Sequence, residues 1–356
     1  MYLHLILIWL IYLCNLIKKE QKMFNSQEIK DIQNLITPDN KIVIITHYNP
    51  DGDAIGSSLG LKHFLRTLSV EAEVIVPNDF PKFLKWMPEA KKITIAEYKK
   101  KKALELIKDA DVIFCLDFNT LSRIGIVGEW VSKSPATKIL IDHHQQPDAF
   151  DFVYSDTSIP ATSQMVFHFI EALENTQKLN QSIAECLYTG IMTDTGGFRF
   201  RSTSATTHRI IAQLIEHGAD PANITSNTWD TNTISRLNLL SLILGRIELI
   251  KNGEIAILWL KRSELQMYGF QKGDTEGFVN YGLSLLGVKV SAFFMEDLYE
   301  DFIKISFRSK DTADVNQFAR QYFNGGGHIN AAGGKYHKSI EDTIQDFKEI
   351  ALQWDI

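Results

Sequence analysis

The sequence predicts an α/β protein with a parallel sheet and flanking helices in its first part, followed by a smaller α/β domain with a mixed sheet. Short apolar runs alternate with helix-patterned segments over the first 218 residues, which is typical of parallel strands joined by helices. Beyond residue 245, strand-like runs follow one another closely, and two of them flank Asn252-Gly253, a strong hairpin signal. The length of 356 residues is enough for two domains.

Changes in pattern divide the chain into four parts. Residues 1–22 form an apolar extension, residues 23–218 the first domain, residues 219–245 a linker region with an apolar helix, and residues 246–356 the second domain. The hydrophobic content of 45% and the charged content of 22% are ordinary for a globular protein, so each domain can bury a core of its own.

The extension is treated separately from the two domains. The segment 2–17 is mostly apolar, but it is shorter than the ~20 residues of a spanning helix and lacks the features of a signal peptide. Met23 opens an ordinary start, in which Asn25 or Ser26 can cap a helix. We expect translation to begin at Met23 and no stable membrane association, with an N-terminal anchor as the alternative.

Charge and cysteine content restrict the partners and the compartment. The net charge of −6 and the pI of about 5.9 argue against a broad basic surface for long duplex nucleic acid, but they allow a small phosphorylated ligand. Cys14, Cys115 and Cys186 are far apart and form no CxxC motif, so neither a disulfide framework nor a zinc–thiolate site is expected. We therefore expect a reducing compartment, the cytoplasm.

The elements follow in order from these patterns. Apolar runs predict four strands in the first domain, at residues 42–45, 72–76, 112–116 and 138–141. Helical spacing predicts helices at residues 55–68, 98–109, 161–174, 182–192 and 206–217, and in the linker at 234–244. In the second domain, strands are predicted at residues 247–250, 255–260, 288–295 and 302–308.

Acidic and imidazole side chains stand at the ends of three predicted strands. Because the carboxyl ends of parallel strands meet at one edge of a sheet, where such folds place their ligands, we expect these side chains to converge. A further aspartate follows the predicted helix at 182–192. The candidates are His47, Asp51, Asp53, Asp117, Asp142, His143, His144 and Asp194.

Each of these residues alone has an ordinary explanation, such as a helix cap or a hydrogen-bonded histidine. Together they supply more oxygen and nitrogen donors than one metal ion needs, and the number suits two. Carboxylates with some imidazole and no thiolate favour Mn²⁺ or Mg²⁺. Two such ions can clamp a phosphoryl group and activate a water molecule, with a central carboxylate such as Asp117 shared between them.

A glycine-rich stretch near the C-terminus is a weaker candidate. Gly325–Gly327 alone could be a flexible loop, but with His328 it can form an anion cradle of backbone N–H groups and an imidazole. Arg308, at the end of a predicted strand, could reach the same anion. Arg123 is a weaker alternative. The lysine run at 99–102 is expected to be a solvated helix face.

These motifs resemble those of the DHH phosphoesterases. The resemblance is carried by the stretch 47–57 (HYNPDGDAIGS), by Asp117, by the run 142–144 and by Asp194. The stretch 324–333 is similar to the signature of the DHH-associated C-terminal domain, DHHA1. The resemblance covers residue 23 to the end and is strongest with the group that combines oligoribonuclease (nanoRNase) and pAp phosphatase activities.

The resemblance implies roles for individual residues. His47 and Asp51 would hold one manganese ion, Asp53, His143 and Asp194 the other, and Asp117 would bridge the two. Asp142 would orient the neighbouring histidine without holding a metal. Catalysis would rest on Asp117, His143 and His144. In the second domain, the substrate would be bound by Arg308, Gly326, Gly327 and His328.

The resemblance implies a hydrolase that cuts short single-stranded RNA to mononucleotides and converts 3′-phosphoadenosine 5′-phosphate to AMP with two Mn²⁺ ions, for which Mg²⁺ or Co²⁺ could substitute. A phosphodiesterase for cyclic-di-AMP or its product pApA is the first alternative. A family II-type pyrophosphatase or exopolyphosphatase and a non-catalytic nucleotide-binding module are the others. The direction of cleavage and a homodimeric state stay open.

Overall fold

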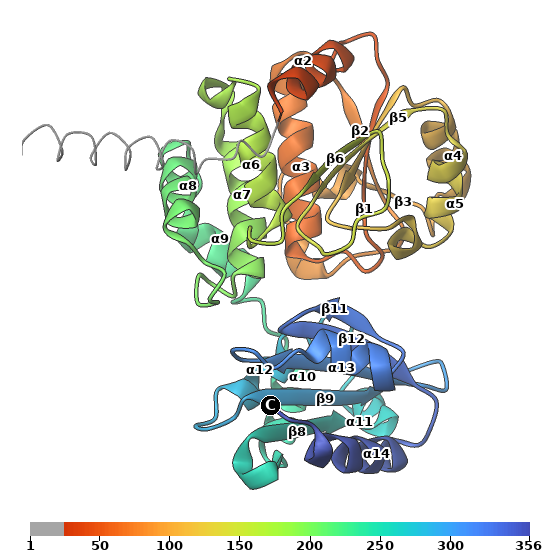
Figure 1. The fold of residues 1–356 in the computed structure, drawn as a ribbon, viewed down its shortest axis with the longest axis vertical. Coiled ribbons are helices and arrows are strands. Elements are labelled where there is room, and N and C mark those ends of the chain that lie inside the picture. Colours follow the sequence, from red (N-terminus) through yellow and green to blue (C-terminus); the bar gives the residue numbers. More distant parts are fainter. Residues whose placement is uncertain (1–24) are drawn as a thin grey trace, which may run out of the picture. The chain divides into compact units, whose positions relative to one another are not determined.

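The computed structural model describes residues 25–356, so the expectations for residues 1–22 lie outside the described part of the chain. The described chain forms two compact units, the first ending at Thr228 and the second spanning Trp229–Ile356 (Figure 1). Among residues 25–356, none of the helices has the length and apolar character needed to cross a membrane.

The first unit is built on a six-stranded sheet in which every pairing is parallel, as predicted. The strand order is β3-β2-β1-β4-β5-β6. The first three strands along the chain are β1 (Ile42–Thr46), β2 (Ala72–Val76) and β3 (Thr94–Ile95). The others are β4 (Val112–Leu116), β5 (Thr137–Asp142) and β6 (Phe152–Ser155).

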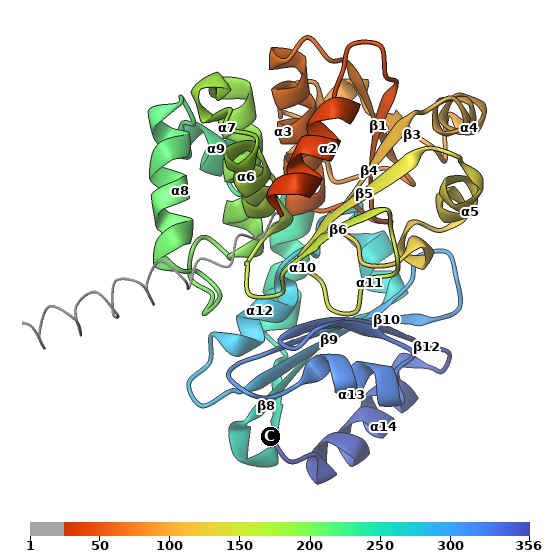
Figure 2. The ribbon, with the colours of Figure 1, turned by 45° about the horizontal axis from the view of Figure 1, so that its top comes forward.

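Helices cover both faces of this sheet, so its central strands are buried on both sides. The strand residues Ile44 and Phe114 pack with α2, α3, α6 and α7 on one face, whereas Ile45 and Cys115 pack with α4 and α5 on the other (Figures 1 and 2). The first-face helices are α2 (Ser26–Leu35), α3 (Gly52–Thr67), α6 (Thr162–Ala172) and α7 (Gln181–Asp194). The others in this unit are α4 (Lys100–Lys108), α5 (Ile126–Lys133), α8 (Ala205–Glu216) and α9 (Pro221–Thr228).

The short strands and 3₁₀ helices of the first unit were not predicted from the sequence. Strands β3 and β6 have two and four residues, lie at the edges of the sheet and contain no long apolar run. Four short 3₁₀ helices, η1 (Lys82–Leu84), η2 (Ala90–Lys92), η3 (Leu121–Ile124) and η4 (Thr176–Lys178), form turns of the connecting loops. Edge strands need only one buried face, which leaves a weaker pattern in the sequence.

Glycines allow α7 to approach both α3 and α6 closely: Gly56 of α3 faces α7, and Gly190 of α7 faces α6. A Cβ atom at Gly56 would lie 2.5 Å from the backbone oxygen of Cys186, and one at Gly190 would lie 1.9 Å from the Ser163 hydroxyl. Real Cβ atoms do not tolerate such distances, so the packing requires glycine at both positions. This close contact brings the start of α3 next to the end of α7.

The second unit also contains a six-stranded sheet, of order β11-β12-β10-β9-β8-β7. Only β8 and β9 pair in parallel, which confirms the predicted mixed sheet. The first three strands are β7 (Glu248–Ile250), β8 (Ile255–Leu260) and β9 (Val290–Glu296). The last three are β10 (Ile303–Ser309), β11 (Gly326–His328) and β12 (Ala331–Tyr336). The Asn252-Gly253 turn, within η5 (Lys251–Gly253), joins β7 to β8 as expected of a hairpin.

Two helical layers cover the second sheet (Figure 2). One face packs against α13 (Val315–Tyr322) and α14 (Ile340–Gln353), with Phe307 and Phe347 in the core between them. The other packs against α10 (Ile234–Leu244), α11 (Arg262–Met267) and α12 (Phe278–Leu283). The glycine stretch, for which a flexible loop was one interpretation, forms strand β11 of a hairpin with β12.

Candidate metal centre

The structure brings together all eight acidic and imidazole candidates of the first unit. Those of β1, β4 and β5 stand at the carboxyl ends of three strands that are adjacent in the sheet. Asp53 lies in the first turn of α3, and Asp194 is the last residue of α7. Contacts of 2.6 to 4.0 Å join these side chains into one cluster.

The loop after β1 is held rigidly by its own polar side chains. Asp51 caps α3, because its Oδ1 accepts hydrogen bonds of 3.0 Å from the N–H groups of Asp53 and Ala54. Asn49, whose φ of 56° is left-handed, exchanges two hydrogen bonds with the buried Asn78 at the end of β2. The loop therefore fixes both the backbone and the Asp51 carboxylate, whose Oδ2 lies 3.8 Å from Nε2 of His47.

Asp117 lies at the centre of the cluster, and its two carboxylate oxygens face two different histidines. Oδ2 lies 3.4 Å from Nε2 of His47, and Oδ1 lies 3.4 Å from Nε2 of His143. The residue is 2% exposed and its φ of 64° is left-handed, an uncommon conformation outside glycine that clusters at functional sites. One carboxylate thus faces two different imidazoles with two different atoms.

Both imidazoles are oriented by a backbone carbonyl on their far side. Nδ1 of His47 lies 2.9 Å from the Tyr48 oxygen, and Nδ1 of His143 lies 3.1 Å from the Ile159 oxygen. Each contact places the ring proton on Nδ1 and directs Nε2 towards the carboxylates. Metal-binding histidines are held in the same way in proteins generally.

Asp142 and His144 form a separate pair within the cluster. The fully buried Asp142 accepts from the His144 backbone N–H at 3.0 Å and contacts Nδ1 of the same ring at 2.6 Å. Both carboxylate oxygens of Asp142 are therefore engaged by one histidine. The arrangement is suited to orienting the His144 ring.

Two residues that the sequence did not single out complete the cluster. The first backbone N–H groups of α6, at Thr162 and Ser163, donate to the two oxygens of Asp53 at 2.5 and 2.8 Å. The Thr162 hydroxyl donates to Oδ1 of Asp117 at 2.9 Å. The only local signal was a Thr-Ser pair at the start of a predicted helix, which normally indicates capping alone.

Burial and mutual proximity displace the pKa values of the cluster in opposite directions. Burial, with the nearby charge of Asp117, raises the pKa of Asp53 to about 7, and burial with the charge of Asp53 raises that of Asp194. Burial opposes the charged forms of His47 and Asp117 too, but contacts with Asp117 and Asp51 outweigh it for His47, and contacts with His143 and His47 outweigh it for Asp117. The pKa of His47 rises to about 10 and that of Asp117 falls.

The donor set fits divalent metal ions. His47, Asp51 and Asp117 offer ligand atoms within 4.8 Å of one another, and so do Asp53, Asp117 and His143. Atoms bound to one ion at 2.0 to 2.2 Å would lie within about 4.4 Å of one another. Among the described residues, histidines are the only ion-pair partners of the buried Asp53 and Asp117 carboxylates, so additional positive charge would stabilise them.

The predicted substrate residues lie on two strands of the second unit, β10 and β11, which both pair with β12. Arg308 on β10 and His328 on β11 are both paired with Ala331 on β12, so they belong to one row across the sheet. Residues directly opposite one another in antiparallel strands share a face. The Gly327 N–H donates to the Asn316 side chain at 2.9 Å, and a Cβ atom at Gly327 would lie 2.3 Å from the Ala331 oxygen.

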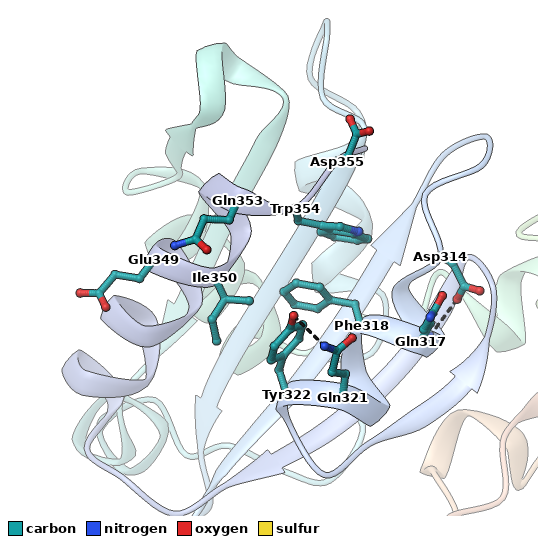
Figure 3. Close-up of a pocket in the computed structure, with 10 residues that line it drawn as sticks. All are labelled: Asp314, Gln317, Phe318, Gln321, Tyr322, Glu349, Ile350, Gln353, Trp354 and Asp355. Carbon is teal, nitrogen blue, oxygen red and sulfur yellow. Dashed lines mark hydrogen bonds between the residues drawn. The ribbon is translucent and has the colours of Figure 1, made fainter.

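Two hollows of the second unit differ in chemistry. A small one of about 40 Å³ is lined by Lys304, Ser306 and Arg308 together with residues near α12. A larger one of about 540 Å³ lies between α13 and α14, where Phe318 stacks on Trp354 (Figure 3). Asp314, Glu349 and Asp355 surround the larger hollow, and their negative charge disfavours a phosphate there.

The fold and the cluster define a class of enzyme, a hydrolase acting on phosphoester bonds whose site can hold metal ions. Two family models match the chain: the DHH family N-terminal domain over residues 41–191 and the DHHA1 domain over residues 255–354. The chain belongs to the DHH phosphoesterase family.

Relatives with recorded activities cover most of the chain. The bifunctional oligoribonuclease and PAP phosphatase NrnA of Thermus thermophilus is 32% identical over 82% of this chain and 83% of its own length. NrnA of Bacillus subtilis is 29% identical over 83% of this chain and 89% of its own length. The cyclic-di-AMP phosphodiesterase GdpP of Geobacillus thermodenitrificans is 26% identical over 89% of this chain, but this covers only 49% of that protein.

A solved structure has the same fold. An exopolyphosphatase-related protein from Bacteroides fragilis is 41% identical, with a TM-score of 0.89 over 94% of this chain and 97% of its own. The similarity therefore extends over both units.

Proposed function

We propose that this protein is a manganese-dependent phosphoesterase that hydrolyses short oligoribonucleotides to mononucleotides and 3′-phosphoadenosine 5′-phosphate to AMP. The observation that carries the proposal is the division of the Asp117 carboxylate between His47 and His143, which suits a residue shared by two metal ions. The bifunctional relatives, which match over more than four fifths of their length, supply the substrate class.

The contacts suggest how the ligands divide between two Mn²⁺ ions, for which Mg²⁺ or Co²⁺ could substitute. His47 and Asp51 would serve one ion, and Asp53, His143 and Asp194 the other, with Asp117 common to both. The 3.4 Å contact of His143 with Asp194 supports the second set. When bound, the ions would stabilise developing charge on phosphoryl oxygens and lower the pKa of a water molecule.

The remaining residues would position the substrate. Asp142 holds the His144 ring through Nδ1, and we propose that Nε2 of His144 faces the substrate phosphate. In the second unit, Arg308 and His328 would bind the phosphate or base at one end of the substrate, and Gly326 and Gly327, which have no side chains, would leave room for it. Arg308 and His328 are both paired with Ala331 and lie on one face of the sheet, which supports a ligand common to both.

In this proposal, catalysis and substrate binding belong to two different domains. The catalytic DHH domain would comprise residues 23–218 and the substrate-binding DHHA1 domain residues 246–356, joined by the linker region 219–245. The boundary between the compact units, at Thr228 and Trp229, falls inside that region. Short single-stranded RNA and small nucleotides would be the partners, and the cytoplasm, where such substrates arise, would be the compartment.

A second candidate is hydrolysis of cyclic-di-AMP or of its linear product pApA. It is favoured by the similarity to GdpP, which extends over 89% of this chain. Since pApA is itself a dinucleotide, one site could serve both reactions. The cyclic substrate distinguishes the two candidates, because it has no free terminal phosphate for Arg308 and His328 to bind.

A substrate panel tests the proposal. Purified protein with Mn²⁺ is assayed on di- to pentaribonucleotides, 3′-phosphoadenosine 5′-phosphate, pApA, cyclic-di-AMP, pyrophosphate and polyphosphate. We expect the short RNAs and 3′-phosphoadenosine 5′-phosphate to be hydrolysed, and Asp117→Ala to abolish both reactions together. Hydrolysis of pyrophosphate or polyphosphate alone would refute the proposal, and an Asp117→Ala variant that keeps one activity would require a second site.

A further inference from the structure

An aromatic residue next in sequence to a member of the candidate metal centre has no role in the proposed chemistry. Tyr48 directly follows His47 in the loop after β1. His47 is 6% exposed and Pro50 is buried, yet the Tyr48 side chain is 50% exposed. The tyrosine ring, which has an apolar face and a polar hydroxyl, is therefore accessible to a ligand beside a buried residue of the cluster.

The backbone that carries the ring is fixed on both sides. The Tyr48 N–H donates to the Arg123 oxygen at 2.8 Å, and the Tyr48 oxygen accepts from Nδ1 of His47 at 2.9 Å. The next residue, Asn49, is held by its two hydrogen bonds to Asn78. The exposed ring therefore projects from a rigid backbone, and a ligand that contacts it would not have to order the loop first.

Open space adjoins the ring. Gly125, at the start of α5, has φ 57° and ψ −136°, a conformation that essentially only glycine adopts. A Cβ atom built at Gly125 would meet no other atom within 4 Å, apart from Cδ2 of Tyr48 at 4.0 Å. The chain thus keeps a residue without a side chain next to the ring, and space for a flat group remains beside it.

We propose that Tyr48 stacks on a nucleobase of the substrate and so positions the attached phosphoester at the metal centre. The inference rests on the proposed function, because it needs a substrate with bases. The Tyr48 hydroxyl could donate to a phosphate, but the ring itself offers a face, and every nucleobase has a π-face that stacks on aromatic rings regardless of sequence. Tyr48→Phe removes the hydroxyl and keeps the face. Tyr48 follows His47 in the chain, so a base on its ring would belong to a nucleotide next to the reacting phosphoryl group.

Kinetics with matched substrates test this role. The wild type and the variants Tyr48→Ala and Tyr48→Phe are compared on pApA and on two abasic analogues of pApA. In one analogue the first base is replaced by hydrogen, and in the other the second base is. Tyr98→Ala is the control, because Tyr98 is 65% exposed on the same unit, lies two residues before α4 and is not a member of the cluster. Circular dichroism melting confirms that each variant is folded.

Stacking predicts a specific pattern of Michaelis constants. We expect Tyr48→Ala to raise KM for pApA at least about fivefold, Tyr48→Phe to stay within twofold, and Tyr98→Ala to match the wild type. On at least one abasic analogue, the wild type and Tyr48→Ala should converge. A rise in KM that is equal on all substrates, or no rise at all, would overturn the stacking role. A wild-type enzyme inactive on pApA and on short RNA would instead refute the proposed function.

Discussion

The contact between α6 and Asp117 gives a direct prediction about metal affinity. The Thr162 hydroxyl is the donor that holds Oδ1 of Asp117, at 2.9 Å, and Thr162 is fully buried. Thr162→Val has nearly the same shape, so it removes the hydroxyl without leaving a void. The backbone N–H of residue 162 keeps its bond to Asp53, so the substitution isolates one hydrogen bond.

The expected magnitude follows from the charge of the acceptor. A hydrogen bond to a charged group contributes about 1.5 to 3 kcal/mol, and replacing a residue that orients a metal ligand typically lowers metal affinity about 10- to 100-fold. We therefore expect Thr162→Val to bind Mn²⁺ about 10- to 100-fold more weakly in isothermal titration calorimetry. The same variant should lose about 1.5 to 3 kcal/mol of unfolding free energy in the metal-free state, measured by urea denaturation.

The matched control is Thr162→Ser, which keeps the hydroxyl and should restore most of the affinity. Because the predicted effect is on metal binding, activity at saturating Mn²⁺ should recover more fully in Thr162→Val than activity at limiting Mn²⁺. A Thr162→Val variant whose Mn²⁺ affinity stays within twofold of the wild type would show that this hydrogen bond does not orient the Asp117 carboxylate for a metal.

Two further predictions concern packing and pH. Gly190→Ala would place a Cβ atom 1.9 Å from its nearest neighbour, so we expect urea denaturation to show a loss of about 1 to 3 kcal/mol. Gly245→Ala, whose nearest contact would be an ordinary 3.5 Å, should change little; equal stabilities of the two variants would contradict the packing account. In the metal-free protein, the pKa values of Asp53 and His47 are raised, so the folded state binds more protons than the unfolded state. The free energy of unfolding therefore falls as pH rises, between 3.8 and about 7 for Asp53 and between 6.5 and about 10 for His47. Since Mn²⁺ replaces those protons, its effect on Tm in differential scanning fluorimetry should be larger at about pH 8.5 than at about pH 6.5; a constant or shrinking effect would contradict this.

The central strands of the first sheet were predictable because they are buried on both faces. Such strands need uninterrupted apolar runs, and the runs at β1, β2 and β4 coincide with the strands to within one residue. The edge strands β3 and β6 carry no comparable pattern. The glycine hairpin was equally hidden, because Gly326 and Gly327 have no side chains to show the alternation of a strand.

The cluster of acidic and imidazole residues was predictable for a topological reason, since strand ends of one parallel sheet must meet at one edge. Contacts that depend on packing between helices were not. Thr162 reaches Asp53 across 109 residues of sequence, and no local pattern indicates such a pair. The spacing of four between Gly52, Gly56 and Gly60 did contain a signal for the close approach of α7, because all three glycines face residues of that helix.

The metal content of the protein tests the central claim most directly. Protein loaded with Mn²⁺, freed of excess ion and analysed for metal by elemental analysis should carry two ions per chain. Asp117→Ala, which removes the carboxylate assigned to both ions, should carry fewer. A wild-type protein with fewer than two ions per chain, or an Asp117→Ala variant that keeps both at wild-type affinity, would contradict the assignment of a paired metal centre to this cluster.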